Sequence, residues 1–81
     1  MSRSSPPHRL SAAEPGTRGC VIRVAVENRE RASRLAALGV TPGASVHVLQ
    51  RFPSVVFMCD QTELAVEPAV AEAILIEIEP T

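Results

Sequence analysis

The chain has 81 residues, enough for one domain, and a domain of this size buries only about 60% of the surface that its unfolded chain exposes. Eight arginines face nine acidic residues, and Trp and Tyr are absent, so the chain lacks the basic surface and stacking aromatics of nucleic-acid-binding proteins. No apolar run approaches the roughly 20 residues that span a bilayer, and residues 1–7 lack a secretory signal's apolar core, so we expect a cytoplasmic protein without membrane insertion.

The first part of the chain predicts a tail, a turn and a strand. Residues 1–9 are rich in Ser, Pro and Arg without periodicity, which predicts a flexible tail, and the folded domain is expected over residues 10–79. A Pro-Gly turn at 14–17 then precedes a predicted strand over 18–26. On this strand we expect Cys20, Ile22, Val24 and Val26 to share one face, opposite a mixed face.

A short helix is predicted next, because both of its ends carry stop signals. Asn28 is suited to cap the free amides of the first turn, and Gly39 stands where a left-handed residue ends a helix. Pro42 prevents the helix from resuming. Arg34 and Leu38, four residues apart, form a stripe on the helix surface. A helix of about ten residues depends on packing against the rest of the domain.

The remainder predicts four more strands and one helical turn. Alternating or continuous apolar residues mark strands at 45–51, 55–59, 62–66 and 74–79, and Pro68 opens a helical turn before the last of these. Five short strands joined by tight turns favour a closed or nearly closed barrel. The predicted fold class is therefore mainly β: a small five-stranded barrel with one short helix after the first strand and a helical turn before the last.

Residue types that could carry chemistry are few. Cys20 and Cys59 are too far apart in sequence for a Cys-x-x-Cys motif, and we expect two reduced, buried thiols on facing strands, with a thiol metal site or a disulfide as alternatives. His47 is the one candidate metal ligand, against the alternative of an ordinary strand histidine; His8 falls in the predicted tail. No catalytic arrangement and no phosphate-binding loop is present, so we expect neither enzymatic activity nor a cofactor.

The most specific motif of the chain runs from Arg34 to Gly43 and reads Arg-Leu-Ala-Ala-Leu-Gly-Val-Thr-Pro-Gly. It matches the pattern R-L-x-x-L-G-[LVI]-x-P-G of the FeoA family of ferrous iron transport proteins, which the sequence resembles from Leu10 to Ile78. The supporting segments are Pro15-Gly16, Gly19-Cys20-Val21-Ile22, Val46-His47-Val48, Arg51-Phe52-Pro53, Glu63-Leu64-Ala65-Val66 and Ala69 to Ile74. One departure is that the Gly-Asp-Pro loop that many members carry after the equivalent of Pro53 is missing, so contacts made through it do not transfer.

The resemblance implies a stand-alone SH3-like barrel that acts in bacterial ferrous iron uptake. Its partner would be the cytoplasmic domain of the membrane ferrous iron transporter, a GTPase-permease, and no catalysis is established for the family. Direct binding of Fe(II) or another transition metal stays open, although no ligand spacing in the sequence supports it. The alternative is a regulatory SH3-like module that self-associates weakly or responds to metal without contacting the transporter.

Five side chains are predicted to contact the partner. Arg34 and Leu38 lie on the helix stripe, and Leu49, Phe52 and Met58 lie around the third and fourth strands. For each of them, the alternative is a role in packing, and Arg34 has Glu30 one turn earlier as a local ion-pair partner. Aromatic-walled recognition of polyproline segments is not expected, because the chain has no Trp or Tyr.

Overall fold

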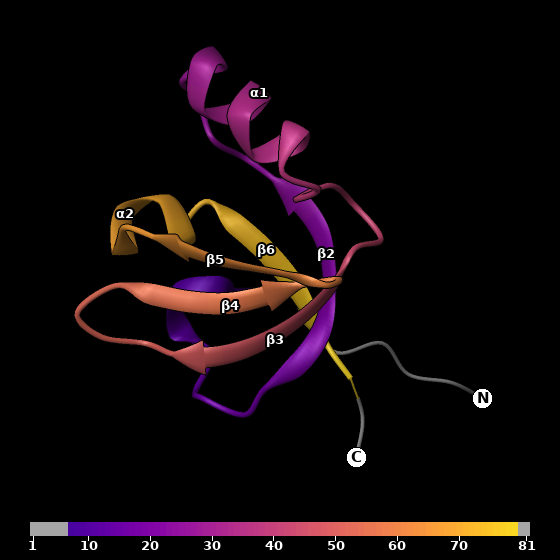
Figure 1. Ribbon diagram of the computed structural model, residues 1–81, viewed down its shortest axis with the longest axis vertical. Helices are drawn as coiled ribbons and strands as arrows, with labels where there is room; N and C mark the ends of the chain where they lie inside the picture. Colours follow the sequence, from indigo (N-terminus) through magenta and orange to yellow (C-terminus); the bar gives the residue numbers. More distant parts are fainter. Residues whose placement is uncertain (1–6, 80–81) are drawn as a thin grey trace.

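The protein folds into one curved antiparallel sheet with two short α-helices (Figure 1). A computed structural model describes residues 7–79. In chain order the elements are β1 (His8–Arg9), the 3-10 helix η1 (Leu10–Ala12), β2 (Arg18–Val24), α1 (Arg29–Ala37), β3 (Ser45–Gln50), β4 (Val55–Cys59), β5 (Thr62–Val66), α2 (Pro68–Ala71) and β6 (Ile74–Ile78). The strand order is β1-β6-β2-β3-β4-β5, so the fold is mainly β, as predicted.

Within residues 7–79 the sheet has six strands instead of the five predicted. The additional strand is β1, in which His8 pairs with Ile76 of β6. Two residues carry no readable alternation, and they form a strand only because β6 offers them a free edge on the side away from β2. His8 and Arg9, assigned to the flexible tail by the sequence, therefore belong to the sheet. The rest of that predicted tail, residues 1–6, lies outside the described residues.

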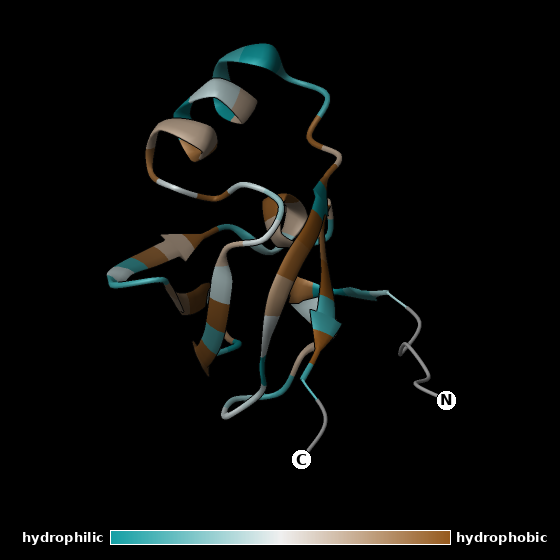
Figure 2. Ribbon diagram, turned by 90° about the vertical axis from the view of Figure 1, so that its right-hand side faces the viewer, coloured by the Kyte–Doolittle hydropathy of each residue, from teal (hydrophilic) through white to brown (hydrophobic). Residues whose placement is uncertain are grey.

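The core is aliphatic, as the lack of Trp and Tyr requires. Leu10 in η1 is fully buried and anchors the start of the domain, and Phe57 of β4 is the one aromatic side chain in the core of the described residues. The other buried hydrophobic residues are Ala13, Val21, Leu35, Val40, Ala44, Val46, Val48, Val55, Cys59, Ala71, Ile74 and Ile76. The strands alternate between hydrophobic and hydrophilic segments accordingly (Figure 2). η1 packs against α2 and β6.

The face predicted for β2 is wrong in its first half. Val21 is buried at 2% exposure, whereas Ile22 is 39% exposed. The reason is an extra residue in β2, because the register with β6 passes from Val21 opposite Ile76 to Arg23 opposite Leu75. Ile22 bulges out of the ladder at this point, and the alternation then changes phase. Val24 therefore packs toward the core, as predicted.

α1 begins and ends where its capping residues predict. The side chain of Asn28 accepts a hydrogen bond from the backbone N–H of Arg31 at 3.0 Å. At the other end, Gly39 takes a φ of +97°, and the N–H of Val40 donates to the carbonyl of Leu35 at 2.9 Å. This is the glycine-dependent closure that satisfies the last free carbonyls of a helix. Val40 and Leu35 are both buried, so apolar packing also stabilises the end of α1.

The Pro-Gly turn after α1 returns the chain to the barrel. The N–H of Ala44 donates to the carbonyl of Thr41 at 3.0 Å, and Gly43 has a φ of +95°, as the third position of a type II turn requires. α1 itself stands at one end of the molecule (Figure 1), and Leu35 is its one buried residue. Much of the helix surface is therefore free to face other molecules.

Candidate functional site: the groove between α1 and β5

A groove of about 280 Å³ lies between α1 and the last strand of the sheet, β5. We call it the α1–β5 groove. It includes two of the five residues predicted to contact a partner, Arg34 and Leu38. The side chains and backbone that line it are Arg31, Arg34, Leu35, Leu38, Ala65, Val66, Glu67 and Val70.

The helix side of the groove follows from spacing alone. Arg31, Arg34, Leu35 and Leu38 stand at i, i+3, i+4 and i+7, so they share one face of α1 and its C-terminal end. Leu35 points into the core at 6% exposure and fixes the helix on the barrel. Leu38, one turn later, is 44% exposed in the groove. The same helix face thus carries Leu35, which packs in the core, and Leu38, which is left open to solvent.

The charges in the groove are unequal. Arg31 and Arg34 contribute two guanidinium groups, and Glu67 contributes one carboxylate. Among the described side chains, Arg34 makes no ion pair with Glu30, the local partner weighed for it from the sequence, and instead lines the groove. The groove therefore combines an apolar floor with a local excess of positive charge.

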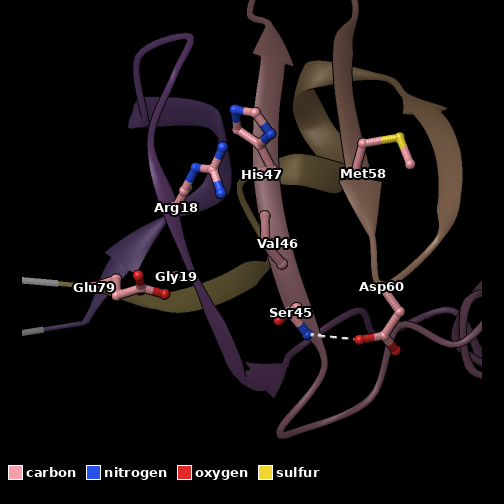
Figure 3. Close-up of a pocket in the computed structure, with 8 residues that line it drawn as sticks. All are labelled: Arg18, Gly19, Ser45, Val46, His47, Met58, Asp60 and Glu79. Atoms are coloured by element: carbon pink, nitrogen blue, oxygen red, sulfur yellow. Dashed lines mark hydrogen bonds between the residues drawn. The ribbon is translucent and has the colours of Figure 1, made fainter.

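A second hollow, of about 290 Å³, lies on the outer face of the sheet (Figure 3). The register places Arg18 of β2 beside His47 of β3, and His47 beside Met58 of β4. Asp60 closes one end, where its Oδ1 accepts a hydrogen bond from the N–H of Ser45 at 3.1 Å. The predicted partner residue Met58 therefore lies next to the candidate metal ligand His47 and away from α1.

His47 has no converging set of ligands around it. Within residues 7–79, no group of three or more His, Cys, Asp or Glu side chains comes together in a way that could hold a metal ion. Asp60 and Glu79 line the same hollow, but Figure 3 shows both carboxylates well apart from the imidazole ring. The cross-strand neighbour of His47 is Arg18, whose positive charge disfavours a metal cation beside it. A metal-binding role for His47 stays a prediction.

The two remaining predicted residues lie elsewhere. Phe52, in the connection between β3 and β4, is 82% exposed and lines a shallow hollow of about 730 Å³ together with Arg9 and Arg51. Leu49 is 40% exposed because it is the extra residue of a second bulge, between Val48 and Gln50. Arg34 and Leu38 thus share the α1–β5 groove, whereas Met58 and Phe52 line two other hollows.

The cysteines are both free and lie on strands separated by β3. Cys59 of β4 is buried, as predicted, and its thiol donates to the carbonyl of Gly39 at 3.4 Å. Burial raises the pKa of the Cys59 thiol, and the Asp60 carboxylate raises it further, so Cys59 behaves as a core residue. Cys20 of β2 is only half-buried, which differs from the expectation, because it lies on the outer side next to Gly19 and Val21, which face inward.

Comparison with known proteins decides the family. The model of the FeoA domain matches residues 8–78. The chain belongs to the FeoA family. Among solved structures, this FeoA chain is similar to an iron uptake regulatory protein, FeoA, with 22% identity over 93% of this chain and 100% of that one, at a TM-score of 0.81. It is also similar to the FeoA protein from Chlorobium tepidum, with 29% identity over 90% of this chain and 71% of that one, at a TM-score of 0.84.

The same fold occurs inside larger proteins. T. acidophilum IdeR is 18% identical, and the match covers 98% of the FeoA chain but 37% of that one, with a TM-score of 0.84. Comparison with curated protein sequences gave no match. These findings confirm the predicted family and the SH3-like fold. Within the described residues, no helix is long and apolar enough to cross a membrane.

Sequence reasoning missed most of the β5 side of the groove. Ala65, Val66 and Val70 read as an ordinary strand and helical turn, and nothing local indicates that α1 lies over them. Arg31 could have been predicted from the sequence, because it stands three residues before Arg34 on the same helix face. A signal for the helix side of the site was therefore present, whereas its position against β5 depends on the tertiary fold.

Proposed function

We propose that this FeoA protein is a cytoplasmic accessory protein of ferrous iron uptake that acts by binding the cytoplasmic domain of the GTPase-containing membrane ferrous iron transporter. The observation that carries the proposal is the α1–β5 groove, in which exposed Leu38 lies beside Arg34 on a helix with one buried residue. Membership of the FeoA family supplies the pathway. The role is non-catalytic: the protein contributes a binding surface.

The groove suits a protein partner better than the other hollows do. Leu38 and Val70 offer apolar surface, and covering the 44% of Leu38 that is exposed contributes about 1 kcal/mol to binding. Arg31 and Arg34 extend from the rim, where guanidinium groups form paired hydrogen bonds with carboxylates. An apolar centre beside Arg side chains is the composition found in protein interfaces.

The test is a binding measurement with the purified cytoplasmic domain of the transporter encoded in the same genome. We expect the double variant Arg34→Glu, Leu38→Gln to bind at least about tenfold more weakly than the unaltered chain, because it reverses a rim charge and removes the exposed apolar contact. Ile22→Gln is the matched control, since Ile22 is 39% exposed and lies on β2 outside the groove. It should bind normally.

The same variants should separate in cells that lack the native gene. Uptake of radioactive ferrous iron is expected to be restored by the unaltered chain and by Ile22→Gln, and not by the double variant. The midpoint of thermal unfolding must be similar for the unaltered chain, Ile22→Gln and the double variant, because both altered groove residues are exposed. Normal binding and normal uptake by a folded double variant would contradict the proposed surface.

A second candidate function is a self-associating or metal-responsive regulatory module. The similarity to T. acidophilum IdeR and to a manganese-dependent transcriptional repressor favours it, although identities of 18% and 20% show the fold alone. Sedimentation at several protein concentrations, with and without Fe(II) or Mn(II), distinguishes the two functions. A monomer that ignores both concentration and metal supports the accessory role, whereas a metal-dependent dimer supports the regulatory one.

A further inference from the structure

Strand β5 has an open edge. It is the last strand in the sheet order, with β4 on one side and no other described strand on the other. Edge strands are usually protected by Pro, Lys, a bulge or a covering element, because their free backbone groups pair readily with another chain. β5 reads Thr-Glu-Leu-Ala-Val, with one charged residue, and its register with β4 runs without a shift. Pro, Lys and a bulge are therefore absent from β5, and its one charged side chain is Glu63.

The register shows which backbone groups are free. β4 and β5 are joined by the two-residue connection Asp60–Gln61, and this geometry makes Cys59 and Thr62 a hydrogen-bonded pair. Hydrogen-bonded pairs alternate along an antiparallel ladder, so Leu64 and Val66 also bond toward β4. The N–H and C=O groups of Glu63 and Ala65 consequently point away from the sheet.

The α1–β5 groove meets this edge at Ala65. Ala65 is exposed on one face of the strand, whereas Val66, on the other face, packs against the core, and both line the groove. The side chains on both faces of a strand added at this edge would therefore contact the groove. Successive side chains of that strand would reach apolar surface and the guanidinium groups of Arg31 and Arg34 in turn.

We propose that the outer edge of β5 binds an extended, acidic and apolar segment of a partner protein as an additional strand of the sheet. Backbone bonds to Glu63 and Ala65 supply affinity, and the groove selects apolar side chains alternating with carboxylates. Arg31 and Arg34 outweigh the one carboxylate of Glu67, and this net positive charge of the groove favours an acidic segment. A second copy of β5, with Glu63 as its one charged residue, is the competing occupant that the tests below distinguish. The inference rests on the proposed function and specifies how its partner is bound.

The probe is a synthetic octapeptide of four Glu-Val repeats, acetylated and amidated at its ends, titrated into isotope-labelled protein and followed by NMR. The amides of Glu63 and Ala65 are expected to shift and to exchange more slowly with solvent. A Lys-Val octapeptide should bind about tenfold more weakly or worse, because it repels Arg31 and Arg34. Shifts confined to residues outside β5 and α1, or equal binding of the two peptides, would overturn the proposal.

The decisive variant is Ala65→Pro. Proline removes the N–H that points outward and places its ring at the edge, while the bonds from Leu64 and Val66 to β4 are kept. We expect the variant to remain folded and to lose binding about tenfold or more, whereas Ala65→Ser binds as the unaltered chain does. Full binding by folded Ala65→Pro refutes edge pairing. If that variant does not fold, a peptide N-methylated at alternate residues must fail to bind the unaltered protein, and its binding would refute the proposal equally.

Three further outcomes bear on this inference, and the last two separate it from the proposed function. A concentration-dependent dimer that Ala65→Pro abolishes would assign the edge to a second copy and overturn the partner segment. If the Glu-Val peptide binds at β5 but the transporter's cytoplasmic domain does not bind, the edge inference stands and the proposed partner fails. If that domain binds Ala65→Pro and the unaltered chain equally, the partner stands and the edge inference fails.

Discussion

Gly19→Ala tests a close backbone approach between β2 and β6. Gly19 of β2 lies opposite Ile78 of β6 and is buried. A methyl group at Gly19 would overlap the backbone carbonyl of Glu77 and come within 3.1 Å of the Cα of Ile78. Because both neighbours belong to the backbone, no side-chain rotation relieves the contact. The sheet must separate locally between β2 and β6.

The size of the effect follows from two opposing terms. Overpacking against a well-packed region costs about 1–3 kcal/mol, and a backbone obstacle puts Gly19 at the upper end. Replacing Gly by Ala restricts the unfolded chain and returns about 0.4–1 kcal/mol. The expected net loss is about 2 kcal/mol, which lowers the midpoint of thermal unfolding by about 10 °C in a domain of this length.

Urea unfolding followed by far-UV circular dichroism measures the loss, since the chain has neither Trp nor Tyr to report by fluorescence. Gly39→Ala is the comparison, because Gly39 has a φ of +97° and nothing within 4 Å of an added methyl group. That variant should lose about 1–2 kcal/mol through backbone strain and leave the β2–β6 amides protected from exchange. A change below about 0.5 kcal/mol in Gly19→Ala, or unaltered protection of those amides, would refute the reasoning.

Further predictions concern the core and the helix. The raised pKa of Cys59 means that the unfolded chain loses its thiol proton first, so stability should fall as pH rises above about 8.5, and Cys59→Ala should remove that slope in urea titrations. Asn28→Ala should cost about 1 kcal/mol and speed amide exchange in α1 specifically. Phe57→Ala should cost about 3–5 kcal/mol by thermal unfolding, whereas Phe52→Ser should stay within about 0.5 kcal/mol, because Phe57 is buried and Phe52 is 82% exposed.

The parts of the fold that depend on local chemistry were predictable. The ends of α1 follow from Asn28 and Gly39, and the start of β3 follows from the turn at Pro42 and Gly43, because each of these residues acts on its immediate neighbours. The alternating apolar residues that predict β3 include Val46 and Val48, and both are buried. In such segments the sequence contains the whole cause of the structure.

The parts that depend on distant partners were not predictable. β1 is a strand only because β6 presents an edge to His8 and Arg9. Ile22 and Leu49 are exposed because bulges insert one residue against a partner strand, which no alternation within a single strand reveals. A single inserted residue moves the following side chains to the opposite face, so a small change in register reverses an exposure prediction.

The candidate site shows the same division. Arg34 and Leu38 were expected to share a face, and they do, because four residues are about one helical turn. That this face opens onto Ala65 at an unpaired sheet edge depends on packing between segments about thirty residues apart in the sequence. Leu49, Phe52 and Met58 were predicted as apolar residues around the third and fourth strands, but position in the sequence does not show which surface a residue lies on, and Met58 and Phe52 line different hollows.

The stability of α1 connects the fold to the proposed docking. With Leu35 as its one buried residue, and with its end closed through Gly39 and Val40, the helix gains little from packing along its length. Helices this short are marginal without such packing, so α1 is expected to open locally more easily than the strands. A partner strand seated between β5 and α1 would give Leu38 a second packing surface, and α1 would become more ordered when the groove is filled. The residues that bind the partner would then also be those that binding stabilises, which makes the order of α1 a direct readout of docking.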